Sequence, residues 1–250
     1  MIKRTIKGLL HWLGYEIRNI KYQRPPRGYT LYRYVKNDGT FDYDRYRRVQ
    51  IAGNHAKIDK VFATESNIRF LSTYIEKIIG QPRFGICHGS RRGKEQEWFR
   101  KYLGCEVIGT EISDSATEFP HTIQMDFHET KTQWVGAVDF IYSNAFDHSY
   151  DPEKSLDAWM SCLTSRGLCI IEHSRSHRAR PAIELDPFGA DLYLMPYLIA
   201  KWGKGHYGIL EIIDAPEGSG NEEFSSFIII QRYEATHPVN QEETPTATRR

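Results

Sequence analysis

From residue 64 onward, short apolar segments with strand character alternate with longer segments whose apolar residues recur at helical spacing. The strand-like segments are FGICHG at 84–89, CEVIGTEI at 105–112, HTIQMDF at 121–127, VDFIYSN at 138–144, GLCIIEHS at 167–174, YGILEIID at 207–214 and SSFIIIQRY at 225–233. The helix-like segments are 68–80, 93–104, 152–163 and 190–202. This alternation predicts a doubly wound α/β fold with a seven-stranded, mostly parallel sheet. Because no helical pattern separates the last two strands, we expect them to pair at one edge with the last strand antiparallel.

Composition sets the expected organisation of the chain. With 250 residues, 40% of them hydrophobic and 26% charged, it can bury a substantial core. We expect an N-terminal extension over 1–63, the α/β domain over 64–235 and a disordered tail over 236–250. No apolar run approaches the roughly 18 residues of a membrane-spanning helix, and the start lacks the features of a secretory signal. Four cysteines without CxxC spacing favour reduced thiols and a cytoplasmic location over a zinc site or disulfide scaffold.

The first 50 residues are strongly basic. They carry twelve Lys or Arg and four Asp or Glu, a local charge of +8, against −7 for the rest of the chain. Apolar residues recur there at helical spacing, which predicts an amphipathic helix: Ile2, Ile6, Leu9, Leu13, Ile17 and Ile20. A helix over residues 1–22 would suit peripheral contact with a membrane, packing on its own domain, or binding of a partner. A basic face that is merely solvated is the remaining alternative.

Residues 29–50 interleave tyrosines with arginines. Aromatic and guanidinium groups together can grip a sugar or a nucleic acid. The same residues can form a lid or a packing layer on the domain, which is the interpretation we favour.

The first strand–turn–helix of the domain has the glycines of a ligand-binding turn. Gly89 and Gly93 flank this turn, where the backbone can approach a ligand at the N-terminus of the next helix. About twenty residues further on, Glu111 lies near the end of the next strand, where a carboxylate can accept hydrogen bonds from both ribose hydroxyls of a nucleoside cofactor. The glycines do not have the GxGxxG spacing of dinucleotide-dependent dehydrogenases, so that alternative is disfavoured.

At these residues the chain resembles the class I S-adenosylmethionine-dependent methyltransferases, over roughly residues 64–233. FGICHGSRRG stands at the first motif, VIGTEIS at the second, QMDF at the third, VDFIYSNAFDHS at the fourth and GLCIIEHS on the strand that follows. The resemblance implies a Rossmann-like fold and S-adenosylmethionine as cofactor. It implies that Glu111 contacts the ribose and Asp126 the adenine amino group, and that Phe127 flanks the ring. The expected cofactor site is completed by Gly89, Ser90, Gly93, Ile112 and Ser143.

The first motif departs from the family pattern in two places. Cys87 or His88 stands where an acidic residue is usual, and the middle glycine is replaced within Ser90-Arg91-Arg92. We expect Arg91 and His88 to hold the carboxylate of the cofactor's methionine end, since guanidinium groups pair with carboxylates bidentately. The alternatives are arginines that face solvent and a degenerate cofactor site.

Methyl transfer to a hydroxyl requires a general base, which we expect beyond the carboxyl ends of the strands. His148 is the first candidate, with Asp147 as an alternative base or as the carboxylate that orients it. His173 is the second candidate, and Glu172 could orient either histidine. A helix cap for Asp147–His148 and a structural hydrogen bond for His173 are the simpler alternatives. A divalent cation such as Mg²⁺ could hold the acceptor oxygen, with Asp147, Asn144 and Asp186 as candidate ligands, although no spacing demands a metal.

The long segment 173–202 suggests an insertion that shapes an acceptor pocket, and its basic run HSRSHRARP suggests an anionic acceptor. We therefore expect an S-adenosylmethionine-dependent O-methyltransferase acting on a hydroxyl of a sugar, a glycan or a similar polar small molecule. An RNA methyltransferase is one alternative, but SNAF at 143–146 lacks the proline–aromatic pair with which base-amino methylases grip a flipped base, so a nucleic-acid partner is disfavoured. A non-catalytic scaffold that docks on a membrane or a glycan-assembly partner is the other.

Overall fold

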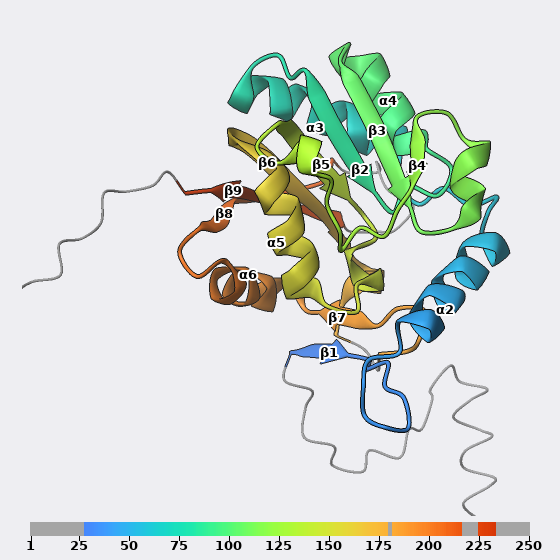
Figure 1. The fold of residues 1–250 in the computed structure, drawn as a ribbon. Coiled ribbons are helices and arrows are strands. Elements are labelled where there is room, and N and C mark those ends of the chain that lie inside the picture. The colour runs from blue at the N-terminus through green and yellow to red at the C-terminus, as the bar shows by residue number, and fades with distance from the viewer. Residues whose placement is uncertain (1–27, 180–181, 217–224, 234–250) are drawn as a thin grey trace, which may run out of the picture.

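The computed structural model describes residues 28–179, 182–216 and 225–233 (Figure 1). Its main sheet consists of β2 (Phe84–His88), β3 (Glu106–Glu111), β4 (Thr122–Gln124), β5 (Val138–Ser143), β6 (Leu163–Ser174), β8 (Tyr207–Asp214) and β9 (Ser225–Arg232). The strands lie in the order β4-β3-β2-β5-β6-β9-β8. The pairings from β4 to β6 are parallel, and β9 is antiparallel to both β6 and β8. The predicted fold class is confirmed, including the edge pair, in which β9 lies inside and β8 outside.

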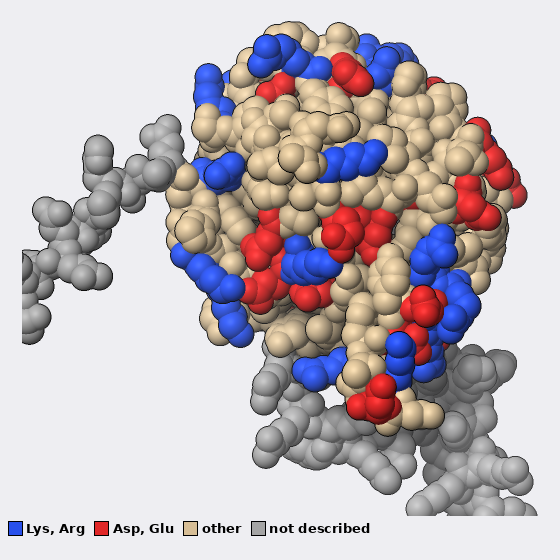
Figure 2. Space-filling view, in the orientation of Figure 1, with Lys and Arg blue, Asp and Glu red and all other residues tan. Residues whose placement is uncertain are grey.

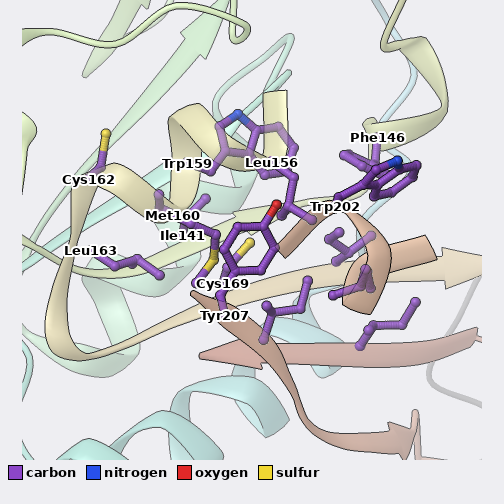
Figure 3. Close-up of a cluster of buried hydrophobic side chains, with 14 of the residues drawn as sticks. Ile141, Phe146, Leu156, Trp159, Met160, Cys162, Leu163, Cys169, Trp202 and Tyr207 are labelled. Carbon is purple, nitrogen blue, oxygen red and sulfur yellow. The ribbon is translucent and has the colours of Figure 1, made fainter. Parts of the chain in front are cut away.

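Helices cover both faces of this sheet (Figure 1). They are α3 (Glu65–Ile79), α4 (Lys94–Leu103), α5 (Pro152–Cys162) and α6 (Met195–Gly203). The buried side chains of α3 and α4 belong to one apolar cluster, and those of α5 and α6 belong to a second on the other face. Figure 3 shows the second cluster, where Trp159 and Met160 of α5 and Trp202 of α6 pack over the strands.

The apolar spacing explains why α3 forms where it was predicted. Ile68, Leu71 and Ile75 are fully buried against the sheet. The Thr64 side chain accepts a hydrogen bond from the amide of Asn67, which caps the first turn, and Gly80 ends the helix at a φ of 78°. The predicted helix over 190–202 was partly wrong. It begins only at Met195, because Phe188–Ala190 forms strand β7, which pairs antiparallel with β1 (Tyr29–Leu31).

An unpredicted helix, α2 (Tyr43–Ala56), lies with β1 and β7 at the end of the sheet where the parallel strands finish (Figure 1). Its buried residues are Tyr46, Gln50 and Asn54, one turn apart. Because two of the three are polar, the apolar spacing that reveals an amphipathic helix is absent. Tyr34 and Tyr46 are each 2% exposed, so this part of the Tyr/Arg-rich segment packs on the domain.

The predicted amphipathic helix over 1–22 and the predicted disordered tail lie outside the described residues. No described helix combines the length and the apolar character needed to cross a membrane. On the face seen in Figure 2, acidic and basic side chains are interspersed. Some form ion pairs on and around α5, such as Lys154 with Glu129 at 2.6 Å and Lys204 with Glu153 at 2.7 Å. This face therefore carries no extended field of one sign.

Candidate active site

A cavity of about 280 Å³ opens at the carboxyl ends of the parallel strands. Its lining comes from the turn between β2 and α4, the segments that follow β3, β4, β5 and β6, and α2 with the loop behind it. Ligands of open α/β sheets bind at this end, where the strand order reverses and the connecting loops diverge. The chain therefore places polar groups from distant segments around one cavity.

The turn after β2 is closely packed. Gly89 has a φ of 71°, and a Cβ on it would lie 2.5 Å from the Cβ of Ala145. The amides of Gly89 and Ser90 both donate to the carbonyl of Thr110, at 2.9 and 3.1 Å. Arg91 replaces the usual middle glycine but keeps a positive φ of 39°, so the backbone retains a conformation that favours glycine.

Glu111, at the end of β3, is 6% exposed and lines the cavity. One carboxylate oxygen accepts from the amide of Arg91 and the other from the amide of Ser113, both at 3.1 Å. These bonds hold the group at the cavity wall and tie it to the glycine turn. A carboxylate has about four acceptor positions, so it can still accept hydrogen bonds from a bound diol.

Asp126 follows β4 and also lines the cavity, with Phe127 beside it. Its Oδ1 accepts from the amide and the Nδ1 of His128, at 2.9 and 2.7 Å, while Oδ2 is buried without a hydrogen-bond partner among the described residues. Burial acts to raise the pKa of Asp126, but the hydrogen bonds and charge of His128, with a smaller contribution from the Tyr43 hydroxyl, outweigh it and hold that pKa below its usual value. The residue is therefore an anion with one free acceptor, suited to an exocyclic amine.

The two arginines of the turn hold the loop that follows α2. Arg91 Nη1 donates to the carbonyl of Lys60 and Arg92 Nη1 to that of Asp59, each at 3.2 Å. The Arg91 guanidinium lies 5.1 Å from the ring centre of Phe62. Both arginines line the cavity, and the buried Arg91 Nε has no partner among the described residues.

His88 lies outside the cavity lining. It is 3% exposed, stacks on Trp159 with ring centres 4.8 Å apart, and its Nδ1 lies 2.8 Å from the Thr110 hydroxyl. Burial, with a smaller contribution from His128, lowers the pKa of His88 to about 3, so the ring is neutral. Of the other expected cofactor residues, Gly93 and Ser143 also lie outside the lining, whereas Ser90 and Ile112 are part of it.

The fold places one of the two predicted base sites at the cavity and the other away from it. Asp147 and His148, in a short helical turn at Phe146–His148, line the cavity. His148 Nδ1 lies 2.7 Å from the carbonyl of Leu185, which can only accept, so Nδ1 carries the proton and Nε2 keeps its lone pair. His173 does not line the cavity; its Nε2 donates to the carbonyl of Ala190 at 2.8 Å, and burial lowers its pKa.

His177 is a site residue that was not singled out in the sequence, where it stood only as part of a basic run. Its Nδ1 accepts from the amide of Ser174 at 2.8 Å, so the proton of the neutral ring is on Nε2. That nitrogen lies 3.6 Å from Asp147 Oδ1. Arg175 and Arg178 of the same run are not among the residues that line the cavity.

Helix α2 supplies further side chains that the sequence did not indicate. Gln50 Nε2 donates to the carbonyl of Leu185 at 3.0 Å, the same oxygen that accepts from His148. The Tyr46 hydroxyl donates to the carbonyl of His148 at 3.2 Å. These contacts hold the backbone carbonyls of Leu185 and His148, and so support the position of the His148 ring from outside the turn that carries it.

A possible cation site lies at the same end of the cavity. Asp147, His148 and Asp186 each offer an atom, and these atoms lie within 4.8 Å of one another. Asp147 Oδ1 is buried without a hydrogen-bond partner among the described residues. Of the predicted ligands, Asp147 and Asp186 are brought together, Asn144 also lines the cavity, and His148 joins them unpredicted as a ligand.

Among solved structures, 1,6-didemethyltoxoflavin-N1-methyltransferase of Burkholderia thailandensis, with its acceptor and S-adenosylhomocysteine bound, is similar with a TM-score of 0.58. It is 13% identical, over 77% of this chain and 91% of that chain. The chain has the class I methyltransferase fold. The plantazolicin methyltransferase BpumL, with a substrate analogue and S-adenosylhomocysteine, gives a TM-score of 0.56 at 13% identity, over 76% of this chain and 96% of that one.

A sugar N-methyltransferase from a Streptoalloteichus species shares this methyltransferase fold with a TM-score of 0.50 and 11% identity, over 72% of this chain and 91% of that one. No protein-family model matches the chain, and no curated protein matches it either. At such low identity the likeness shows the fold alone. The chemistry has to be argued from the chain's own residues.

Proposed function

We propose that the chain is an S-adenosylmethionine-dependent O-methyltransferase whose acceptor is a sugar hydroxyl or a similar polar small molecule. One observation carries the proposal. The carboxylates of Glu111, which is buried, and of Asp126, whose side chain is 7% exposed, line a single cavity beside the glycine turn, in the fold of proteins that bind S-adenosylhomocysteine.

The unpartnered polar atoms in this cavity fit the cofactor. Glu111 has free acceptor capacity for the ribose hydroxyls, and Asp126 Oδ2 is an unpaired acceptor for the adenine amino group. Arg91 Nε is an unpaired donor suited to the methionine carboxylate. When bound, S-adenosylmethionine supplies a methyl group on a sulfonium, which is already activated for in-line displacement.

The chain's own contribution is to take a proton and to align the acceptor. His148 Nε2 would accept the hydroxyl proton of the acceptor, because the bond from Nδ1 to the Leu185 carbonyl leaves the lone pair on Nε2. The resulting imidazolium is stabilised by Asp147, 4.0 Å from Nε2, and by Asp186, 3.9 Å from Nδ1. His177 directs its Nε2 proton toward Asp147 and helps to position that carboxylate.

The unpredicted N-terminal elements line part of the cavity and are held against the loop at 184–186. The side chain of Glu184 ion-pairs with Arg45 and accepts from the Tyr32 hydroxyl at 3.0 Å. The Glu184 carbonyl accepts from the hydroxyl of Tyr34. These contacts tie α2 and its preceding segment to the loop that carries Leu185 and Asp186.

The donor set at the acceptor end fits a divalent cation. Two carboxylates and an imidazole, with one buried carboxylate oxygen unpaired, match the preferences of such ions. Asp147 and Asp186 would hold the ion, with Asn144 nearby, which would leave His148 Nε2 free to accept the hydroxyl proton. As a Lewis acid it would lower the pKa of a coordinated hydroxyl.

The side chains at this end of the cavity indicate which charge the acceptor would carry. Its described lining includes Asp147, Asp186, Ser174 and His177, and no lysine or arginine of the segment 173–179. Hydrogen-bonding groups and carboxylates of this kind support a neutral polyhydroxyl acceptor. They give no support to the anionic acceptor suggested by the basic run.

Calorimetric titration of the protein with S-adenosylhomocysteine tests the proposal. We expect micromolar binding, and affinity at least about tenfold lower in Glu111→Ala because its hydrogen bonds to ligand and turn are lost. Glu106→Ala, on the exposed opposite end of β3, is the matched control and should bind normally. Undetectable binding to the unmodified protein would refute the proposal, and salt-sensitive RNA binding would favour the nucleic-acid alternative.

A further inference from the structure

Glu95 is a buried acid in the cavity that the function proposed above does not use. It lies in the first turn of α4, two residues after Gly93, is 6% exposed and lines the cavity. Its own backbone amide reaches the carboxylate. No side chain among the described residues forms a hydrogen bond or an ion pair of contact distance with it.

Three other acids that line the cavity, Glu111, Asp126 and Glu172, have such partners, whereas Asp147 is used by the proposed function. Glu111 accepts from two backbone amides, and Asp126 is bonded to His128. Glu172 accepts from Asn67 Nδ2 at 3.0 Å and from the Tyr142 hydroxyl. A buried carboxylate without such partners is costly unless a cation binds beside it. Glu95 is therefore placed to receive a positive group from a ligand.

The charges around Glu95 limit what that ligand can be. Arg91 on the turn is the nearby cation, and Glu172 on β6 and Glu111 on β3 are the nearby acids. Burial, opposed only in part by the backbone amide of Glu95 and by Arg91, raises the pKa of Glu95 to about 7. The Glu95 carboxylate and the unpaired Nε of Arg91, four residues apart in the chain, present a pair of opposite charges to the cavity. This arrangement is complementary to a free amino acid, with its ammonium and carboxylate groups.

The strand that precedes the turn supplies no such anion. Its last residues are Cys87 and His88, both buried, and the neutral His88 ring packs against Trp159. Apart from Glu111, which the proposed function assigns to the ribose, an acidic group at the glycine turn therefore has to come from α4. The first turn of α4 contains two acidic residues. Glu95 lines the cavity, whereas Glu97 is exposed.

We infer that Glu95 binds the α-amino group at the methionine end of the cofactor, opposite Arg91, and selects a ligand with a free amino acid end. The inference rests on the proposed function. In this arrangement Glu95, on the helix after the turn, stands in for the acidic residue that is usual before the turn.

Calorimetry with two ligands tests this role. The unmodified protein, Glu95→Gln and the control Glu97→Gln are titrated with S-adenosylhomocysteine and with its deaminated analogue, in which hydrogen replaces the α-amino group. We expect Glu95→Gln to weaken binding of S-adenosylhomocysteine at least about tenfold and to leave binding of the analogue unchanged. Glu97→Gln should match the unmodified protein with both ligands.

Proton release provides a second measurement. At pH 7 a group of pKa about 7 is half protonated, and an ammonium beside it drives the proton off. Titrations in buffers of different ionisation enthalpy should therefore show release of about half a proton per ligand, which Glu95→Gln abolishes.

The outcomes separate the two proposals. If S-adenosylhomocysteine binds the unmodified protein and Glu95→Gln equally, the inference is wrong and the proposed function stands. If Glu95→Gln weakens both ligands equally, its role is structural and the inference is again wrong. If the unmodified protein binds neither ligand, the proposed function itself has failed.

Discussion

Replacing Glu95 with glutamine should make the ligand-free protein more stable, and increasingly so as the pH rises. Glutamine keeps the shape of the side chain but removes the charge that burial disfavours. In the folded protein the pKa of Glu95 is about 7, compared with 4.5 for an unperturbed glutamate. Between these values the folded chain keeps the proton that the unfolded chain has lost. The stability of the unmodified protein therefore falls as the pH rises through this window.

The size of the effect follows from the two pKa values. One pH unit between folded and unfolded pKa corresponds to 1.36 kcal/mol. The step from 4.5 to about 7 therefore amounts to about 3 kcal/mol of lost stability, fully present above pH 7 and absent below about pH 4.5. The glutamine variant lacks this loss. Its free energy of unfolding should exceed that of the unmodified protein by a margin that grows by about 3 kcal/mol between pH 4.5 and pH 8.

Urea unfolding followed by circular dichroism at several pH values from 5 to 8 measures this margin. Taking the difference between variants cancels the pH dependence of every other group. Glu97→Gln, exposed on the same helix, should show no pH-dependent margin. A constant difference between Glu95→Gln and the unmodified protein across this range would refute the assignment of Glu95 as a buried, unpaired acid. Saturating S-adenosylhomocysteine should stabilise the unmodified protein more than the variant, because its ammonium pairs with the carboxylate.

The remaining predictions concern the acceptor end. His148→Gln should lower turnover of an acceptor about 10²- to 10⁴-fold with S-adenosylhomocysteine affinity unchanged, and near-normal turnover would exclude His148 as the base. Asp147→Asn should abolish binding of Mn²⁺, followed by electron paramagnetic resonance, because it removes the buried unpaired carboxylate oxygen. Asp151→Asn, at the cap of α5, should leave any such binding intact, and absence of Mn²⁺ binding to the unmodified protein would rule out the cation site.

The local sequence pattern was enough to predict the strands of the sheet and the positions of two carboxylates of the site. The strand segments could be read because buried parallel strands are continuous apolar runs with clear boundaries. Glu111 and Asp126 could be placed because each lies at or just after a strand end, so that its position depends on the strand rather than on distant contacts. Both line the cavity in the structure.

The roles of the histidines could not be predicted from the local sequence pattern. His88 and His173 look like site residues in the sequence, yet each turns away from the cavity and is buried against another part of the fold. His148 and His177 do line it. What separates the two pairs is the direction of the side chain and the identity of the hydrogen-bond partner, and both depend on segments remote in the sequence.

The sequence by itself therefore determined where the strands and the helices α3, α4 and α5 lie along the chain. Their apolar residues must be buried, and this requirement leaves a pattern in the sequence. Only the tertiary structure decided that α2 covers the cavity. Its buried face carries Gln50 and Asn54, whose burial is tolerated because Leu185 and Ser115 provide their hydrogen-bond partners. Polar burial of this kind is favourable only after the partners have been brought together, so no local pattern can reveal it.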